Sequence, residues 1–434
     1  MALALSRDPL RLLTRLQRDH GDVVRFSIGR YPIHLVSDPE LIREVLVNRA
    51  QEFGKGRALQ RAKTLLGEGL LTSEGTFHAR QRRLVQPAFH SEHFRSYGMI
   101  MSEEAERLAG EWRAGQQINI AREMSDLTLM IVTRTLFGGE CGRHEASLVH
   151  EALTTSLSLF PLSYLPFSHL LERLPLPATQ RFRRAKQQLD ATIYSLIAQR
   201  RASPDASRRD VLSLLLSAQD AEGNGEGMSD EQVRDEAMIL FLAGHETTAN
   251  ALAWTWYLLG QHRDVEERVL REIDELSAGG RALGFDDVPR LPYTRRVLME
   301  SMRLFPPAWA LGRRALFDID LGGWQVPRDS VVLMSQWVVH RSERYYPDPE
   351  RFDPDRWLPE AVATRPKFSY FPFGAGPRVC IGEHFAMAEM VIVLGTLLRR
   401  WSFRPAAQAK PPQPWPTVTL RPKPGVWVEV VPRD

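Results

Sequence analysis

The stretch that decides the fold reads Phe373-Gly-Ala-Gly-Pro-Arg-Val-Cys380-Ile-Gly382. It places one of the chain's two cysteines in a glycine-rich turn that leads straight into an apolar helix. The start of a helix carries a partial positive charge and backbone N–H groups that stabilise a thiolate. A lone cysteine is more often a small buried hydrophobe. The glycine-rich turn and the start of the helix leave a metal-binding thiolate open as the alternative.

The composition is that of an ordinary globular protein. Of the 434 residues, 43% are hydrophobic and 25% charged, and this length allows a large core. The 56 basic and 53 acidic residues are too evenly balanced for a nucleic-acid-binding protein. No linker, repeat or low-complexity tract divides the chain, so we expect one domain over residues 1–434.

The N-terminus and the two cysteines bear on the cellular compartment of the protein. The first residues are too few to span a membrane and lack a signal-peptide cleavage pattern, so we expect no membrane anchor. A metal-bound Cys380 would leave Cys141 without a disulfide partner, which fits a reducing environment. We therefore expect a cytoplasmic protein.

The hydrophobic pattern predicts a mainly α protein with small β segments. A helix over 8–20 is followed by a hairpin over 23–37 that turns at Gly29, and most of 39–303 is predicted to be helical. Three further segments have strand character: 315–321, 330–334 and 417–431. The order of elements excludes an alternating βαβ protein.

The longest predicted helix runs over 229–260. Ser229 is its expected N-cap and Gln232 the capping-box partner. Much of the helix is apolar, but charged and hydroxyl residues lie at its centre, where they would be costly in lipid. The pattern therefore favours a buried central helix over a transmembrane one.

The centre of this helix reads Ala243-Gly244-His245-Glu246-Thr247. The two small residues leave room for a large flat ligand, while Thr247 can hydrogen-bond across that gap and Glu246 can relay protons to it. The alternative is a threonine bonded to a carbonyl one turn earlier, with Glu246 in a salt bridge. A His-Glu-x-x-His zinc motif is excluded because Ala249 stands at its last position.

Glu300 and Arg303 form a second candidate pair. Their spacing puts a carboxylate and a guanidinium on one face of a helix that Pro306 and Pro307 end. Such a pair is usually a solvated contact.

Taken together, these motifs resemble those of the cytochrome P-450 family over nearly the whole chain. The cysteine stretch resembles its haem-binding signature, the 243–247 stretch its oxygen-activation motif, and Glu300 with Arg303 its Glu-x-x-Arg motif. The resemblance implies a single-domain cytochrome P-450 fold of the soluble bacterial type. Haem b would lie between the long central helix and the loop and helix that bear Cys380, its iron ligand.

The resemblance also assigns residues to the haem. His78 and Arg82, four apart in a helical segment, would bind its propionates together with Arg313 and Arg378, and Arg314 could replace Arg313. Other residues would contact the haem directly: Phe373, Gly374, Gly382, Ala243 and Gly244. Gly376 and Gly382 would let the backbone pass close to it. Glu246 and Thr247 would be the catalytic pair.

In the family, the Glu-x-x-Arg pair is buried and joined by a second arginine downstream. Arg351 and Arg356 are the two candidates. Arg356 ends a Phe-x-Pro-x-Arg run, Phe352-Asp-Pro-Asp-Arg356, and is therefore the expected partner. The resemblance gives this cluster a structural role: it supports the region that positions the cysteine loop.

The implied reaction inserts one oxygen atom from O2 into a small apolar substrate such as a fatty acid, terpenoid or carotenoid. Electrons would come from a separate ferredoxin or flavodoxin with its reductase, and we expect a monomer. The alternatives are a haem-thiolate peroxygenase or isomerase, and a haem-binding sensor or electron carrier. Both are disfavoured by the Glu246-Thr247 pair, which they do not need.

The substrate pocket and the donor surface are placed by the same resemblance. The pocket would be lined by 58–71 and by Ala308-Trp-Ala-Leu311, with Trp309 and Leu311 over the haem. Arg80 and Arg83 would offer positive charge to an acidic donor protein.

Overall fold

The structure, a computed structural model, describes residues 7–29, 31–138, 177–203, 205, 208–223, 225–276 and 281–433. Cys141 lies outside these described residues. The chain divides into two compact units. Unit 1 comprises Met1–Gly56, Met101–Leu127 and Thr247–Asp434, and unit 2 comprises Arg57–Ile100 and Thr128–Glu246. The expectation of one domain over 1–434 stays a prediction.

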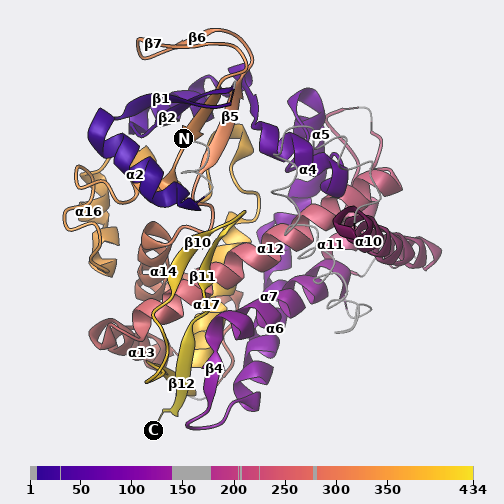
Figure 1. The fold of residues 1–434 in the computed structure, drawn as a ribbon. Coiled ribbons are helices and arrows are strands. Elements are labelled where there is room, and N and C mark those ends of the chain that lie inside the picture. Colours follow the sequence, from indigo (N-terminus) through magenta and orange to yellow (C-terminus); the bar gives the residue numbers. More distant parts are fainter. Residues whose placement is uncertain are drawn as a thin grey trace. The chain divides into compact units, whose positions relative to one another are not determined.

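Unit 1 is built on a five-stranded sheet with the order β1-β2-β8-β5-β3 (Figure 1). Its strands are β1 (Val23–Ile28), β2 (Tyr31–Val36), β3 (Phe53–Lys55), β5 (Leu311–Ala315) and β8 (Val331–Met334). Strands β2 and β8 are parallel, and the other neighbours are antiparallel. The predicted hairpin is confirmed, and Gly29 in its turn has a φ of 58°.

Helix α2 (Pro9–His20) is the predicted N-terminal helix. The Asp8 carboxylate caps it by accepting a hydrogen bond from the Arg11 N–H at 3.0 Å. Its apolar side, Leu12, Leu13 and Leu16, packs in one buried cluster with residues of β1 and β2. A polar cap and an apolar stripe are thus enough to place this helix against the sheet.

The rest of unit 1 surrounds the cysteine loop with helices and short strand pairs. Its further elements are α3 (Pro39–Arg43), β6 (Ile319–Leu321), β7 (Trp324–Val326), α13 (Arg263–Leu276), α14 (Pro292–Leu304), α15 (Gln336–Val339), α16 (Pro359–Ala363) and α17 (Glu383–Leu398). A three-stranded sheet contains β4 (Gln117–Asn119), β12 (Trp427–Pro432) and β9 (Trp401–Pro405), and β10 (Gln413–Pro416) pairs with β11 (Leu420–Lys423). Of the predicted strand segments, 330–334 corresponds to β8, whereas 315–321 is divided between the end of β5 and β6, and 417–431 between β11 and β12.

Unit 2 is helical in its described residues. Its helices are α4 (Arg57–Leu66), α5 (Gly75–Val85), α10 (Pro177–Ala202) and α11 (Val211–Ser217). Three longer helices run from one unit into the other: α6 (Ser91–Glu111), α7 (Ile120–Phe137) and α12 (Asp230–Leu259).

Helix α12 is the predicted central helix. Its capping box is present, because the Gln232 N–H donates to the Ser229 hydroxyl at 3.2 Å and the Ser229 N–H donates to the Gln232 side chain at 3.0 Å. Among the helices of the described residues, this one included, none combines the length and apolar character that a membrane crossing requires.

Candidate functional site

The cysteine loop is closed by two backbone hydrogen bonds. The Cys380 N–H donates to the Phe373 carbonyl at 2.9 Å, and the Gly374 N–H donates to the Phe371 carbonyl at 3.0 Å. Cys380 is exposed, and α17 begins three residues later at Glu383. The sequence prediction of an accessible thiol in a turn before an apolar helix is therefore confirmed.

Each glycine of the cysteine loop is explained by a different physical requirement. Gly374 and Gly376 have φ angles of 72° and 69°, which side-chain-bearing residues rarely adopt. A Cβ on Gly376 would lie 2.0 Å from the carbonyl oxygen of Leu46. This glycine is thus required by protein packing, whereas the sequence suggested close approach to a ligand. Gly382, with a φ of −92°, caps α17.

Arginine side chains tie this loop to the five-stranded sheet. The Arg378 guanidinium donates to the Phe53 carbonyl at 2.9 Å and to the Ala50 carbonyl at 3.3 Å. Phe53 begins β3, the edge strand next to β5, and Ala50 lies in the short 3-10 turn just before it. The loop and this sheet edge therefore form one continuous part of unit 1.

The sheet edge carries two buried cations. Arg313 on β5 is 6% exposed, and it lies directly opposite Lys55 on β3, which is 4% exposed. Like charges in opposite positions repel, so this pair suits an anionic ligand. Arg314 instead forms an ion pair with Asp329 at 3.2 Å, which favours Arg313 as the ligand-binding arginine. Sequence reasoning missed Lys55, whose only signal is a charge ending a short apolar strand.

In unit 2, His78 and Arg82 lie one turn apart on α5, as predicted. His78 is buried and Arg82 is partly buried.

The neighbouring Arg80 and Arg83 are engaged within the protein. Arg83 donates to both oxygens of Asp220 at 3.0 and 2.9 Å, and the Arg80 guanidinium lies 3.6 Å from the same carboxylate. Glu222 lies 3.8 Å from Arg83. These two cations and two anions carry no net charge, so the expected positive surface for a donor protein is not present at these four residues.

The centre of α12 has one open face. Ala243 is exposed and Thr247, one turn later, is partly exposed, although Glu246 and Thr248 are buried. Residues four apart share a helix face, so Ala243 and Thr247 present this face together.

Gly244 has a packing role in addition to the haem contact that the sequence predicts for it. A Cβ on Gly244 would lie 3.0 Å from Val132 Cγ2 on α7. The small residue therefore lets two helices of unit 2 pack closely.

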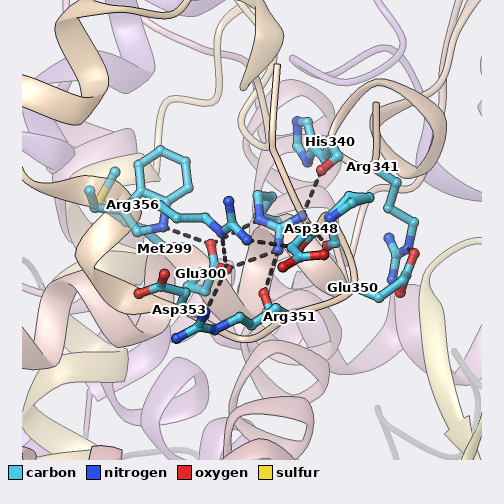
Figure 2. Close-up of polar contacts among 12 residues, drawn as sticks. Met299, Glu300, His340, Arg341, Asp348, Glu350, Arg351, Asp353 and Arg356 are labelled. Atoms are coloured by element: carbon cyan, nitrogen blue, oxygen red, sulfur yellow. Dashed lines mark hydrogen bonds and ion pairs between the residues drawn. The ribbon is translucent and has the colours of Figure 1, made fainter. Parts of the chain in front are cut away.

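The Glu300 cluster is buried and joined by several hydrogen bonds (Figure 2). Arg303 donates to the two carboxylate oxygens of Glu300 at 2.9 and 2.8 Å, and both side chains are 0% exposed. The Arg303 guanidinium also donates to the backbone carbonyls of His340, Pro349 and Arg351. The pair thus fixes the segment after α15 onto α14.

Arg356 is the second arginine of this cluster, as the sequence predicted. Its Nε lies 3.4 Å from the Glu300 carboxylate, and its Nη2 donates to the Asp348 carbonyl at 2.7 Å. Arg351 is exposed and contributes only its carbonyl. The Glu300 carboxylate also accepts hydrogen bonds from the Asp353 N–H and the Trp357 indole, each at 3.0 Å.

The segment expected to line the pocket is held by the β10–β11 hairpin. The Trp309 indole donates to the Thr417 carbonyl at 3.0 Å, and the Leu420 N–H donates to the Pro307 carbonyl at 3.0 Å. Trp309 packs against the buried cluster of α2, and its expected place over the haem stays a prediction. Val418, between β10 and β11, is 51% exposed.

Leu311 lies beside the cysteine loop. Its Cδ1 is 3.6 Å from the position of a Cβ on Gly374. On its outer side the loop borders a groove of about 640 Å³ in unit 1. The charged residues of this groove are Glu40, Arg43, Lys367 and Glu383. Two acids and two bases leave it without a dominant sign of charge.

The residues of unit 1 suit the group that the sequence implies. An exposed thiol can ligate iron, Leu311 and Phe373 supply apolar contacts beside it, and the buried Arg313 and Lys55 match carboxylate groups. These residues fit haem b, whose iron accepts one soft thiolate ligand. Its ring is apolar, and it carries two anionic propionate side chains.

Comparison with known proteins agrees with this chemistry. The family model described as "Cytochrome P450" matches residues 2–428. A relative named cyclooctatin synthase, from Streptomyces melanosporofaciens, is 42% identical over 97% of this chain and 91% of its own length. Cyclooctat-9-en-7-ol 5-monooxygenase from the same organism is 38% identical, with coverages of 93% and 87%.

A solved structure, that of the cytochrome P450DA heme domain, superposes with a TM-score of 0.90 at 26% identity. The match covers 100% of this chain and 95% of that one. The mainly α architecture with small sheets is thereby confirmed.

Proposed function

We propose, from the premise that this chain belongs to the cytochrome P450 family, that it oxidises an apolar terpenoid. The chain is a cytochrome P450 monooxygenase with haem b as its cofactor. When bound, haem would supply the oxidising chemistry for incorporation of one atom of O2 into a C–H or C=C bond. The protein supplies ligation, protons and orientation of the substrate.

One observation carries the assignment of the site: the exposed Cys380 thiol in a closed turn before α17. In the proposed arrangement Cys380 ligates the iron, while Arg313 and Lys55 bind propionate oxygens. His78, Arg82 and Arg378 are further propionate-binding candidates. Phe373 and Gly374 contact the haem on the cysteine side, with Gly382 at the start of α17.

Protons are proposed to pass through the centre of α12. Glu246 is buried, and Thr247 belongs to the open face with Ala243. A buried carboxyl can store a proton, and a hydroxyl can pass it on while holding a ligand in place. This assignment of Glu246 and Thr247 favours the monooxygenase over the peroxygenase, isomerase and sensor alternatives.

The substrate class is supported by the relatives and by the pocket. The relatives are named for cyclooctatin and cyclooctat-9-en-7-ol. The lining candidates in unit 1 are Ala308 and Leu311, both of them apolar. Each CH2 group of the substrate that these residues bury would contribute about 0.8 kcal/mol to the free energy of binding. We therefore propose a cyclic terpenoid over a fatty acid or carotenoid.

Electrons are proposed to come from a separate ferredoxin or flavodoxin. The groove beside the cysteine loop has charges of both signs. It therefore suits a donor protein whose binding is directed by specific ion pairs more than by net charge.

The haem-thiolate assignment is tested by the ferrous–CO spectrum of purified protein. Thiolate ligation shifts the Soret band strongly to the red, and Cys380→Ser should abolish that band. Cys141→Ser, the matched control, should leave it unchanged. A thiolate spectrum that persists in Cys380→Ser would overturn the assignment.

The substrate class is tested by spectral titration. Cyclic terpenoids should displace iron-bound water and shift the spin state at lower concentration than fatty acids of equal carbon number. Affinity should rise with each added CH2 until the pocket is full. A flat affinity across the series, or a preference for a charged hydrophilic ligand, would contradict an apolar terpenoid pocket.

A further inference from the structure

His340, which directly follows α15, is hydrogen-bonded both to the Glu300 cluster and to the chain that enters the cysteine loop. Its backbone carbonyl accepts a hydrogen bond from the Arg303 guanidinium at 2.8 Å (Figure 2). Its imidazole Nε2 accepts a hydrogen bond from the Phe371 N–H at 3.1 Å. His340 and Arg303 are 0% exposed, and Phe371 is 3% exposed. One buried residue of unit 1 therefore joins the buried ion pair to the cysteine loop.

Phe371 sets the direction in which the chain enters this loop. Its carbonyl accepts a hydrogen bond from the Gly374 N–H at 3.0 Å, and further along the Cys380 N–H donates to the Phe373 carbonyl at 2.9 Å. Its ring belongs to a buried cluster with residues of β3, β5 and β8. The ring, carbonyl and N–H of Phe371 are thus all engaged, and His340 supplies the acceptor for the N–H.

The imidazole of His340 is itself held in place. Its ring centroid lies 5.0 Å from that of Tyr370 and 5.4 Å from that of Phe371. The Tyr370 hydroxyl donates to the Met299 carbonyl of α14 at 3.0 Å, and the His340 N–H donates to the Gln336 carbonyl of α15 at 2.9 Å. Neighbours on both sides therefore fix the direction of the Nε2 acceptor.

The surroundings also keep this imidazole neutral. Burial lowers the pKa of His340 well below its ordinary value, and the positive charges of Arg303 and Arg341 lower it further. The backbone carbonyls of Met302 and Arg303 oppose this shift only in part. A neutral imidazole accepts a hydrogen bond at one nitrogen, whereas the charged form donates at both. Because Nε2 is the acceptor, the proton belongs on Nδ1.

We propose that His340 is a positioning residue through which the Glu300–Arg303 pair holds the cysteine loop in its ligating arrangement. Without an acceptor at Nε2, the buried Phe371 N–H would lack a hydrogen bond, which favours openings that bring it to water. The loop that presents Cys380 is then held less firmly. The inference rests on the proposed function, because it takes Cys380 to be the iron ligand.

The first test measures amide hydrogen exchange in the haem-loaded protein. His340→Leu removes the acceptor but keeps an apolar side chain in the site, whereas His340→Gln keeps an acceptor oxygen at the end of a side chain of similar length. In His340→Leu, exchange at the Phe371 and Gly374 amides should be about tenfold to a hundredfold faster, the factor that an unsatisfied buried donor implies. His340→Gln should stay near the parent rate.

The matched control is His34→Leu on β2. His34 is also a histidine of unit 1 and is 1% exposed, but neither of its ring nitrogens has a hydrogen-bond partner among the described residues. This variant should leave exchange at Phe371 unchanged. Amides of β12, which pairs with β4 and β9, should exchange at the parent rate in every variant. Equal exchange at Phe371 in His340→Leu and the parent, or a uniform acceleration across unit 1, would overturn the proposal.

The second test uses the parent protein alone, so it holds even if His340→Leu does not fold. Nitrogen-15 NMR of the ferrous–CO state should show a neutral His340 ring with its proton on Nδ1. A proton on Nε2 would overturn the proposal, because that nitrogen could not then accept from Phe371.

The third test follows retention of the thiolate ligand. The red-shifted ferrous–CO band should disappear in dilute urea at least several-fold faster in His340→Leu than in the parent, and at the parent rate in His340→Gln and His34→Leu. Equal rates in His340→Leu and the parent, or equal acceleration in His340→Leu and His340→Gln, would overturn the role of the acceptor. A parent protein without the band would contradict the proposed function itself, so the two failures are distinguishable.

Discussion

Arg303 bonds to both carboxylate oxygens of Glu300 in a part of unit 1 where neither side chain is exposed. Three backbone carbonyls take the other hydrogen bonds of the guanidinium. A buried pair of this kind adds little net stability, because desolvation offsets the attraction. Its value lies in fixing the chain that it bonds, here the segment from His340 to Arg351 (Figure 2).

Loss of Glu300 should therefore be severe. Glu300→Ala leaves the Arg303 guanidinium buried without its carboxylate, at a cost of about 3 to 5 kcal/mol in the free energy of unfolding. We expect low haem content and a lowered urea midpoint. Haem retention equal to that of the parent protein would show that the cluster does not support the cysteine loop.

The two downstream arginines should differ in the same assay. Arg356→Ala removes a side chain that is 10% exposed and 3.4 Å from Glu300, so it should lower haem content. Arg351→Ala changes an exposed side chain and keeps the carbonyl that Arg303 uses, so it should behave like the parent protein. A greater loss in Arg351→Ala would reverse the assignment.

Local signals in the sequence were sufficient for several elements. A cap and an apolar stripe define α2, residues of high strand preference on either side of Gly29 define β1 and β2, and a capping box defines the start of α12. The strands that were missed, β3, β4, β7, β9 and β10, are three to five residues long, and of the five-residue β5 only Ala315 was predicted. Strands this short depend on pairing with partners distant in sequence, which a local pattern does not contain.

In the candidate site, too, some residues were predicted from local motifs and others are recognisable only in the folded structure. Cys380 and Arg356 were identified by motif spacing, whereas Lys55 becomes visible only when β3 pairs with β5. Gly376 packs against Leu46 and Gly244 packs against Val132. Because these partners are distant in sequence, a local sequence pattern does not reveal the contacts.

Thr247 should control the use of electrons without controlling haem binding. If its hydroxyl passes protons from Glu246, Thr247→Ala should still bind haem and consume reductant but release hydrogen peroxide. General acid–base groups contribute about 10² to 10⁴ in rate. The measurement compares product and peroxide formed per NAD(P)H. Thr248→Val, a change at the buried neighbour, is the control, and full coupling in Thr247→Ala would remove Thr247 from the mechanism.

Asp220 should suppress charge steering by Arg80 and Arg83. The hydrogen bonds from Arg83 lower the pKa of Asp220, so its carboxylate stays ionised at neutral pH. Asp220→Asn leaves both guanidinium charges without this neutralising partner. Reduction by an acidic ferredoxin should then become faster at low ionic strength, and the gain should vanish when the Debye length falls to about 10 Å near 0.1 M salt.

The control for this prediction is Glu106→Gln, which removes the carboxylate partner of Arg399 in unit 1. It should leave the salt dependence of reduction unchanged. An Asp220→Asn variant that shows the parent salt dependence would place the donor surface elsewhere, for example at the groove beside the cysteine loop.

Glu389 on α17 should be uncharged at neutral pH. Its side chain is 1% exposed, and neither carboxyl oxygen has a hydrogen-bond partner at bonding distance among the described residues. Burial raises its pKa well above 4.5, and the nearby Thr248 hydroxyl opposes this shift only in part. We expect a protonated-carboxyl band in the infrared spectrum that disappears in Glu389→Gln.

The same pKa shift makes stability depend on pH with a definite sign. Because the folded protein holds the proton more tightly than the unfolded chain, the contribution of Glu389 is most favourable below the unfolded pKa and falls as pH rises above it. Glu389→Gln does not titrate, so its free energy of unfolding should gain on the parent by up to about 1.4 kcal/mol per pH unit in this window. Urea unfolding at a series of pH values measures the difference, and Glu383→Gln at the partly exposed start of α17 is the control. A Glu389→Gln difference that stays constant from acid to neutral pH would mean that Glu389 is ionised inside the protein.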